Sequence, residues 1–104
     1  MKQIWKYQIT LHEISNDPYH ISCPEGTEIL SVGEQVGKLC IWAIVDPDKE
    51  RCDKAFTIVA TGQPITFDKA RFIGTVQIPY FGELVFHVFH LLDKADFGTE
   101  GNVS

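Results

Sequence analysis

Basic residues are scarce in this sequence, and their scarcity excludes one large class of partner. Nine lysines and arginines stand against fourteen aspartates and glutamates, which gives a formal net charge of -5 over 104 residues. A protein that binds duplex nucleic acid through its phosphates needs a clustered basic surface. Because the positive residues here are few and dispersed, we expect no duplex nucleic acid partner.

Cysteine is also scarce, with three residues in all, Cys23, Cys40 and Cys52. Their odd number and the lack of any C-x-x-C spacing argue against a disulfide framework and against a zinc knuckle. We therefore expect reduced cysteines in an intracellular protein.

Long apolar runs are missing as well. The first ten residues, MKQIWKYQIT, alternate polar and apolar side chains, so no signal-peptide core is readable there. No later stretch is long enough to cross a membrane as a helix. We expect no membrane partner.

Familiar catalytic motifs are absent too. Nothing matches a phosphate-binding loop or the nucleophile turn of a serine hydrolase. The polar run over residues 46–54, DPDKERCDK, lacks the glycine and the later bidentate glutamate of a calcium loop, and we interpret it as an exposed connection. These absences favour a binding protein that is not an enzyme, with no cofactor and no metal site.

The clearest structural signal that is present is a β-hairpin over residues 29–46, ILSVGEQVGKLCIWAIVD. Val36 and Gly37 lie where a tight turn is needed, and glycine supplies the positive φ of such turns. In the return strand, residues 38–45, one face carries Leu39 and the other carries Trp42, and both faces are apolar. Such a strand is either covered on both sides or has one face open to a ligand or partner.

Short strand-like segments recur along the rest of the chain, at residues 2–11, 19–23, 55–61, 71–78 and 83–92. The first two are candidates for an N-terminal hairpin, and Gly74 indicates a bulge, a bend or a close approach to the backbone. The pattern predicts one all-β domain over residues 1–92, a small antiparallel β-sandwich or partly open β-barrel of about seven strands with little helix. Residues 93–104 are predicted to form a loosely ordered tail.

Two histidines, His87 and His90, lie in one strongly apolar segment. Their spacing of three places them on opposite faces of a strand, so they do not form an intrastrand zinc pair. Each is interpreted either as a hydrogen-bonded histidine in or beside the core, or as a residue that grips an anionic ligand or acts as a base.

Other candidate ligand contacts come from aromatic and hydroxyl side chains. Aromatic faces can stack on a base, backbone amides beside glycine can hold phosphate oxygens, and threonine hydroxyls add donors. The same residues also suit a core position or ordinary turns. The predicted ligand-binding residues are Trp42, Thr61, Gly62, Thr75, Tyr80, Phe81, His87 and His90.

Several segments together resemble a family of short, uncharacterised bacteriophage proteins that open with a strand of the MKxIWKY type. The segments that carry the resemblance are MKQIWKY at 1–7, ILSV at 29–32, KLCIWAIVDP at 38–47, TGQP at 61–64, IGTVQ at 73–77 and FHVF at 86–89. The resemblance covers residues 1 to about 92 and carries no catalytic residues with it.

The resemblance implies a phage or prophage origin and a location in the cytoplasm of the host bacterium. By analogy it favours a counter-defence sponge that sequesters a nucleotide-derived immune signal, in a pocket shared by subunits of a homo-oligomer. Two alternatives stay open, an inhibitor that covers a host defence protein and a small structural or assembly protein of the virion.

Overall fold

The computed structural model describes residues 1–10, 18–79 and 84–92 of the chain, and the tail predicted over 93–104 lies outside them. Within the described ranges the chain forms seven strands and no α-helix, which confirms the all-β prediction. The strands are β1 (Gln3–Ile9), β2 (Tyr19–Pro24), β3 (Glu28–Gln35), β4 (Lys38–Val45), β5 (Arg51–Ala60), β6 (Ala70–Gln77) and β7 (Val85–Leu91).

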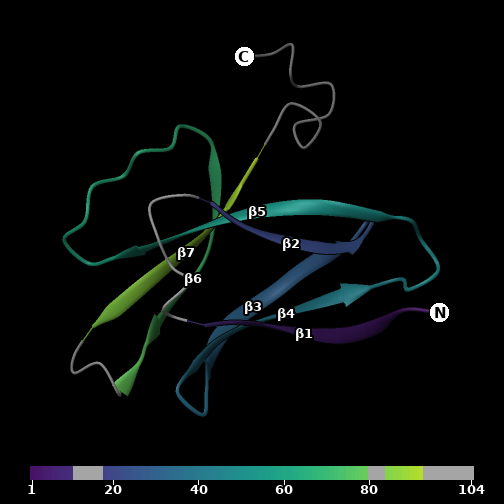
Figure 1. Cartoon of the computed structure of the whole chain (residues 1–104), viewed down its shortest axis with the longest axis horizontal. Helices are drawn as coiled ribbons and strands as arrows, with labels where there is room; N and C mark the ends of the chain where they lie inside the picture. Colours follow the sequence, from purple (N-terminus) through teal and green to yellow (C-terminus); the bar gives the residue numbers. More distant parts are fainter. Residues whose placement is uncertain (11–17, 80–83, 93–104) are drawn as a thin grey trace.

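The seven strands form two antiparallel sheets (Figure 1). The three-stranded sheet has the order β1-β4-β3, and the four-stranded sheet has the order β2-β5-β7-β6. At one edge of the molecule β3 lies against β6 without joining its sheet. Of the two architectures that the sequence left open, the chain is a β-sandwich and not a closed barrel.

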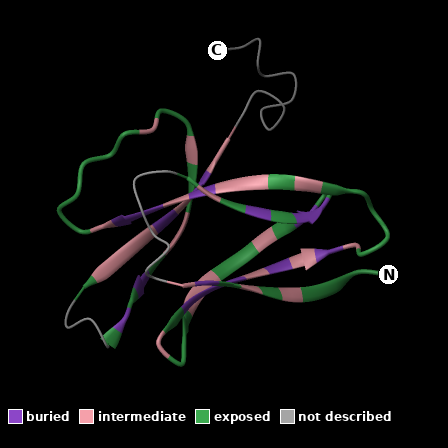
Figure 2. Ribbon diagram, viewed as in Figure 1, coloured by how far each residue is buried: buried purple, intermediate pink, exposed green. Residues whose placement is uncertain are grey.

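The hydrophobic core lies between the sheets, and the buried segments in Figure 2 are concentrated on the strands of both sheets. From β4 the inward residues include Leu39 and Ile41, and Phe56 of β5 and Val88 of β7 meet them from the other sheet. The opposite face of β4, which carries Trp42, is the outer face of the three-stranded sheet. The strand is therefore central in its sheet, with one face in the core and the other, which carries the buried Cys40 and the half-buried Trp42, on the outside of the sandwich.

The predicted hairpin is confirmed as β3 and β4, joined by Val36 and Gly37. Both turn residues have positive φ, 52° and 76°, as a type I′ turn requires. The backbone N–H of Gly37 donates a hydrogen bond of 2.7 Å to the Glu34 carboxylate, which holds the turn from one side.

Two predictions about pairing and strand limits are wrong. β1 pairs with β4 and β2 pairs with β5, so the first two strands lie in different sheets and form no hairpin. β5 begins at Arg51, so the last part of the predicted connection over 46–54 is strand. Its polar residues are extended because they pair with β2, where Cys52 faces Cys23 and Arg51 faces Pro24.

Gly74 marks an irregularity in β6, as predicted. The pairing of β6 with β7 shifts register between Phe72 and Gly74. A Cβ atom at Gly74 would lie 2.7 Å from Cγ1 of Val32, which belongs to the other sheet. The missing side chain thus lets β6 and β3 approach each other at the closed edge of the sandwich.

Candidate functional site

Two adjoining pockets open at the end of the sandwich where the chain passes from β2 to β3. The larger, of about 660 Å³, is lined among others by Glu25, Cys52, Lys54, His90 and Leu92. The smaller, of about 280 Å³, is lined by Thr27, Glu28, Ile29, Lys54, Arg71, Ile73 and His90. Because Lys54 and His90 line both, we treat the two pockets as one site and call it the Lys54 cleft.

Strand alternation brings the polar side chains of the cleft together from three strands. Lys54 lies on β5 two residues before the core residue Phe56 and pairs with the buried Ile21 of β2, so it shares their inward face. Arg71 of β6 is the register partner of His90 of β7, which places these two side chains on one face as well. The three residues are far apart in sequence and meet only through the strand order β5-β7-β6.

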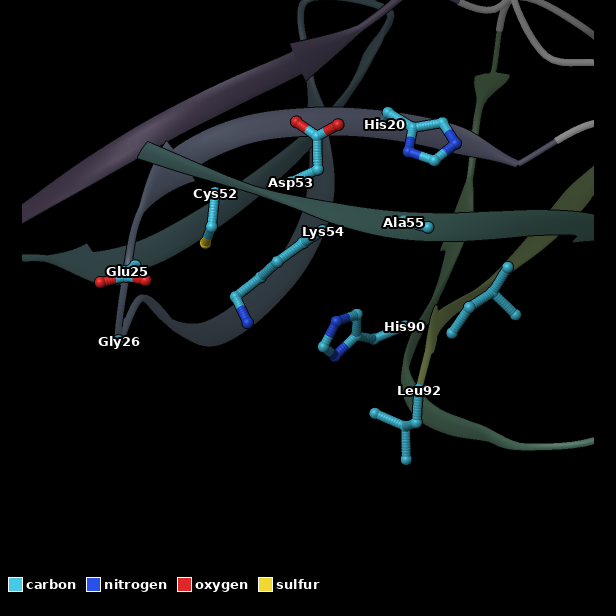
Figure 3. Close-up of a pocket in the computed structure, with 10 residues that line it drawn as sticks. His20, Glu25, Gly26, Cys52, Asp53, Lys54, Ala55, His90 and Leu92 are labelled. Carbon is cyan, nitrogen blue, oxygen red and sulfur yellow. The ribbon is translucent and has the colours of Figure 1, made fainter. Parts of the chain in front are cut away.

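His90 forms the rigid part of the cleft. Its side chain is only 5% exposed, and its ring stacks on that of Phe56 with the centroids 5.1 Å apart. Figure 3 shows the Lys54 side chain extending on the same side of β5 as the His90 ring, whereas Asp53 and His20 point to the other side. A ligand in the cleft would therefore meet the ammonium group and the imidazole together.

The cleft brings two cationic side chains together, Lys54 and Arg71. Within the described residues neither Lys54 nor Arg71 forms an ion pair, although Glu25 and Glu28 also line the pockets. Thr27 is buried, and its hydroxyl already donates a 2.6 Å hydrogen bond to the Pro24 carbonyl. A ligand would thus meet the two cations, Lys54 and Arg71, beside the carboxylates of Glu25 and Glu28.

Such a set of side chains suits an anionic group. A guanidinium can hold a carboxylate or phosphate through two parallel hydrogen bonds, and an ammonium adds a point charge. In the described part of the chain no group of three or more His, Cys, Asp or Glu side chains is placed to hold a metal ion. The same ranges contain no helix long and apolar enough to span a bilayer.

Three of the predicted ligand-binding residues meet elsewhere, on the outer face of the four-stranded sheet. The Thr61 hydroxyl lies 2.8 Å from Nε2 of His87, and the Thr75 hydroxyl lies 3.0 Å from Nδ1 of the same ring. Gly62 follows directly in a turn with φ of 99°. Both nitrogens of His87 are thus engaged within the protein, and a ligand would have to displace a threonine to reach either one.

The other predicted residues lie apart from this cluster. Trp42 is on the outer face of the three-stranded sheet, with its ring 3.3 Å from where a Cβ of Gly33 would be. Of the predicted residues that the structure describes, only His90 lines the Lys54 cleft, and it lies on the face of β7 opposite to His87, as predicted. Tyr80 and Phe81 lie outside the described residues.

Sequence reasoning missed Lys54 and Arg71 as candidate ligand contacts. Lys54 belongs to the run interpreted as an exposed connection, and Arg71 stands at the start of a predicted strand. One signal was available for Lys54, because Cys52, Lys54, Phe56 and Ile58 continue a period of two through the start of β5. Nothing local to Arg71 indicates that it faces His90.

A sequence family covers nearly the whole chain, since the profile of the domain of unknown function DUF7352 matches residues 1–96. The chain belongs to the DUF7352 family. The match takes in all seven strands and every residue of the Lys54 cleft, so the cleft is part of the DUF7352 domain itself. No curated protein and no solved structure matches the chain.

Proposed function

We propose that this protein is a non-enzymatic binding protein that holds a phosphate-bearing, nucleotide-derived small molecule in the Lys54 cleft. The observation that carries the proposal is the pair of cations, Lys54 and Arg71, that face one cleft without an ion-pair partner among the described residues. Because the two cations come from different strands and line one pocket beside His90, they offer charge and hydrogen-bond donors to an anion from outside.

Size and shape support a ligand larger than a single phosphate. Small-molecule sites typically enclose about 300–1,000 Å³, and the larger pocket, of about 660 Å³, lies within that range. The cleft is built by one chain, so binding there does not require the homo-oligomer that the sequence led us to expect.

The resemblance to bacteriophage proteins supports the narrower role, a sponge that sequesters a nucleotide-derived immune signal in the cytoplasm of an infected bacterium. A sponge binds its ligand and returns it unchanged. The catalytic motifs missing from the sequence agree with that role, since sequestration needs affinity and no chemistry.

The test is a thermal-shift screen of the purified protein with cyclic oligonucleotides, ADP-ribose derivatives and inorganic pyrophosphate. A ligand at a hundred times its Kd stabilises the folded state by about 2.7 kcal/mol, which is readily measured as a rise in Tm. Chromatography of the bound compound after denaturation then distinguishes a sponge, which returns it intact, from an enzyme, which returns a product.

Charge-neutral variants connect any binding to the cleft. We expect Lys54→Gln and Arg71→Gln each to weaken binding by about 10- to 100-fold, because a hydrogen bond to a charged group contributes about 1.5–3 kcal/mol. Lys38→Gln is the matched control, since it removes the same charge at an exposed position of β4 that lines neither pocket. Equal weakening by all three variants would show only a general charge effect and would refute the site.

The alternative function, inhibition of a host protein, is supported by a different surface. Phe67, Phe72 and Phe89 cluster on the outer face of the four-stranded sheet, with ring centroids 4.9 and 5.5 Å apart. Phe72 is 55% exposed, and Ile65, two residues before Phe67 in the sequence, is 58% exposed. Exposed apolar clusters of this kind mark protein interfaces, so a failed ligand screen would make this surface the better candidate.

A further inference from the structure

The pairing of β2 with β5 places two of the three cysteines directly opposite each other. Cys23 and Cys52 are register partners on neighbouring antiparallel strands, so their side chains lie on the same face of the sheet. All three cysteines are free. The sequence gives no hint of this proximity, because twenty-eight residues separate the two positions.

The backbone hydrogen bonds define the geometry of this pair. The N–H of Glu25 donates a 2.7 Å bond to the Glu50 carbonyl, and hydrogen-bonded and non-hydrogen-bonded pairs alternate along an antiparallel ladder. Pro24, which has no N–H, therefore occupies a non-hydrogen-bonded position opposite Arg51. Cys23 and Cys52 fall at the next hydrogen-bonded position, where Cα atoms lie about 5.5 Å apart, within the span of about 4.4–6.8 Å that disulfides use.

The two thiols differ in their access to solvent. Cys23 is 1% exposed, whereas Cys52 is half-buried and lines the larger pocket of the Lys54 cleft, where Figure 3 shows its sulfur. Burial, opposed in part by the Thr27 hydroxyl, raises the pKa of the Cys23 thiol. A small oxidant thus reaches the Cys52 thiol first, and the adjacent Cys23 thiol can supply the second sulfur of a disulfide.

We propose that Cys23 and Cys52 form an oxidative modification site, which a hydroperoxide converts into a cross-strand disulfide. The Cys52 thiolate attacks a peroxide oxygen, the O–O bond breaks with loss of hydroxide, and Cys52 becomes a sulfenic acid. The Cys23 sulfur then attacks the Cys52 sulfur, the S–O bond breaks, and the thiol proton leaves with the hydroxyl as water. In sum the two thiols are oxidised and one peroxide is reduced to water.

Cys40 takes no part in this reaction. It lies on the outer face of the three-stranded sheet, where its register partners are Gln8 and Gly33, and it is buried. The proposal does not rest on the proposed function, because the disulfide requires only the pairing of β2 with β5, although a ligand in the larger pocket would cover Cys52.

The test uses the full chain, reduced, freed of reductant and exposed to hydrogen peroxide under native conditions. After an acid quench and denaturation, free thiols are alkylated and counted by intact mass. Of the three cysteines we expect only Cys40 to remain alkylatable, and peptide mapping to give a fragment linked through Cys23 and Cys52. Dithiothreitol should restore all three thiols.

Single cysteine variants define which sulfurs react. Cys40→Ser is the matched control and should still form the linked fragment, whereas Cys52→Ser should abolish it. Because Cys52 is only half-buried, serine is better tolerated there than at the fully buried Cys23, and circular dichroism confirms that the variant is folded. Three alkylatable thiols after peroxide, a disulfide that contains Cys40, or disulfides only between chains would each overturn the proposal.

Discussion

His87 is held between two threonine hydroxyls, and the surrounding bonds decide which ring nitrogen carries the proton. The Thr61 hydroxyl also lies 3.4 Å from the Val85 carbonyl, to which it donates. Because its one proton goes to that carbonyl, the Thr61 hydroxyl accepts a hydrogen bond from Nε2–H of His87. Nδ1 of the same ring then carries no proton and accepts a hydrogen bond from the Thr75 hydroxyl. The contacts therefore favour the Nε2–H tautomer and a structural role for this histidine.

Removing one of these hydroxyls tests that role. We expect Thr75→Val to lower the free energy of unfolding by about 1 kcal/mol, because the half-buried ring nitrogen loses its partner. Urea denaturation measures the loss, and nitrogen NMR shifts of the ring report the tautomer. Thr57→Val is the control, since Thr57 lies on the same sheet and its hydroxyl bonds to none of the described residues. An equal loss of stability in Thr57→Val, or an Nδ1–H tautomer of His87, would contradict the assignment.

At the same scale, single residues show what the sequence could and could not say about the candidate cleft. His90 was recognisable because a histidine in an apolar strand is unusual in itself. Lys54 and Arg71 are ordinary residue types in ordinary surroundings, and their importance comes only from facing His90. That juxtaposition depends on strand order, which local pattern does not encode.

Among the elements, the turn between β3 and β4 carries a local conflict between residue type and backbone. Val36 has φ of 52° and is 81% exposed, so a β-branched side chain is held in the left-handed region with little packing in return. Asparagine adopts this conformation readily, and Asn-Gly is the preferred type I′ pair.

We expect Val36→Asn to raise the free energy of unfolding by about 1 kcal/mol, since it relieves backbone strain without removing a buried contact. Chemical denaturation of the purified variant measures the gain. Val36→Thr keeps the branched side chain and replaces only an exposed methyl group, so it should give no comparable gain. If threonine stabilised the protein as much as asparagine, the benefit would come from surface polarity and not from φ.

The features of the strands that depend only on the local sequence pattern were predicted correctly. The hairpin of β3 and β4 follows from its turn and its alternation, and the irregularity at Gly74 follows from the missing side chain. The local pattern could not predict which strands pair. β1 pairs with β4, whereas β2, the next strand in the sequence, pairs with β5 in the other sheet. The start of β5 was missed for the same reason, because its charged residues are extended only through their pairing with β2.

For the whole molecule, burial links stability to alkaline pH through Tyr7, Cys23 and Cys40. Burial raises the pKa of each group above its ordinary value, 10.0 for the tyrosine and 9.0 for the cysteines. Each proton is therefore bound more tightly in the folded state than in the unfolded state. The contribution of these three groups to stability should be fully present below about pH 8 and should be lost as the pH rises through the ordinary pKa values and on to the higher folded ones.

Denaturant unfolding of the reduced protein from about pH 7 to about pH 10.5 measures this fall, and Tyr7→Phe separates the contribution of the tyrosine. Among the described residues no hydrogen bond of ordinary geometry reaches the buried Tyr7 hydroxyl, although Arg51 lies close enough to oppose the rise in its pKa. We therefore expect Tyr7→Phe to be at least as stable as the parent at neutral pH, because phenylalanine keeps the ring and removes an unpaired polar atom. Near the upper end of the range the variant should lose less stability than the parent. A parent whose stability stays level or rises above pH 9, or a variant that loses as much as the parent, would show that these buried groups do not control the alkaline limit.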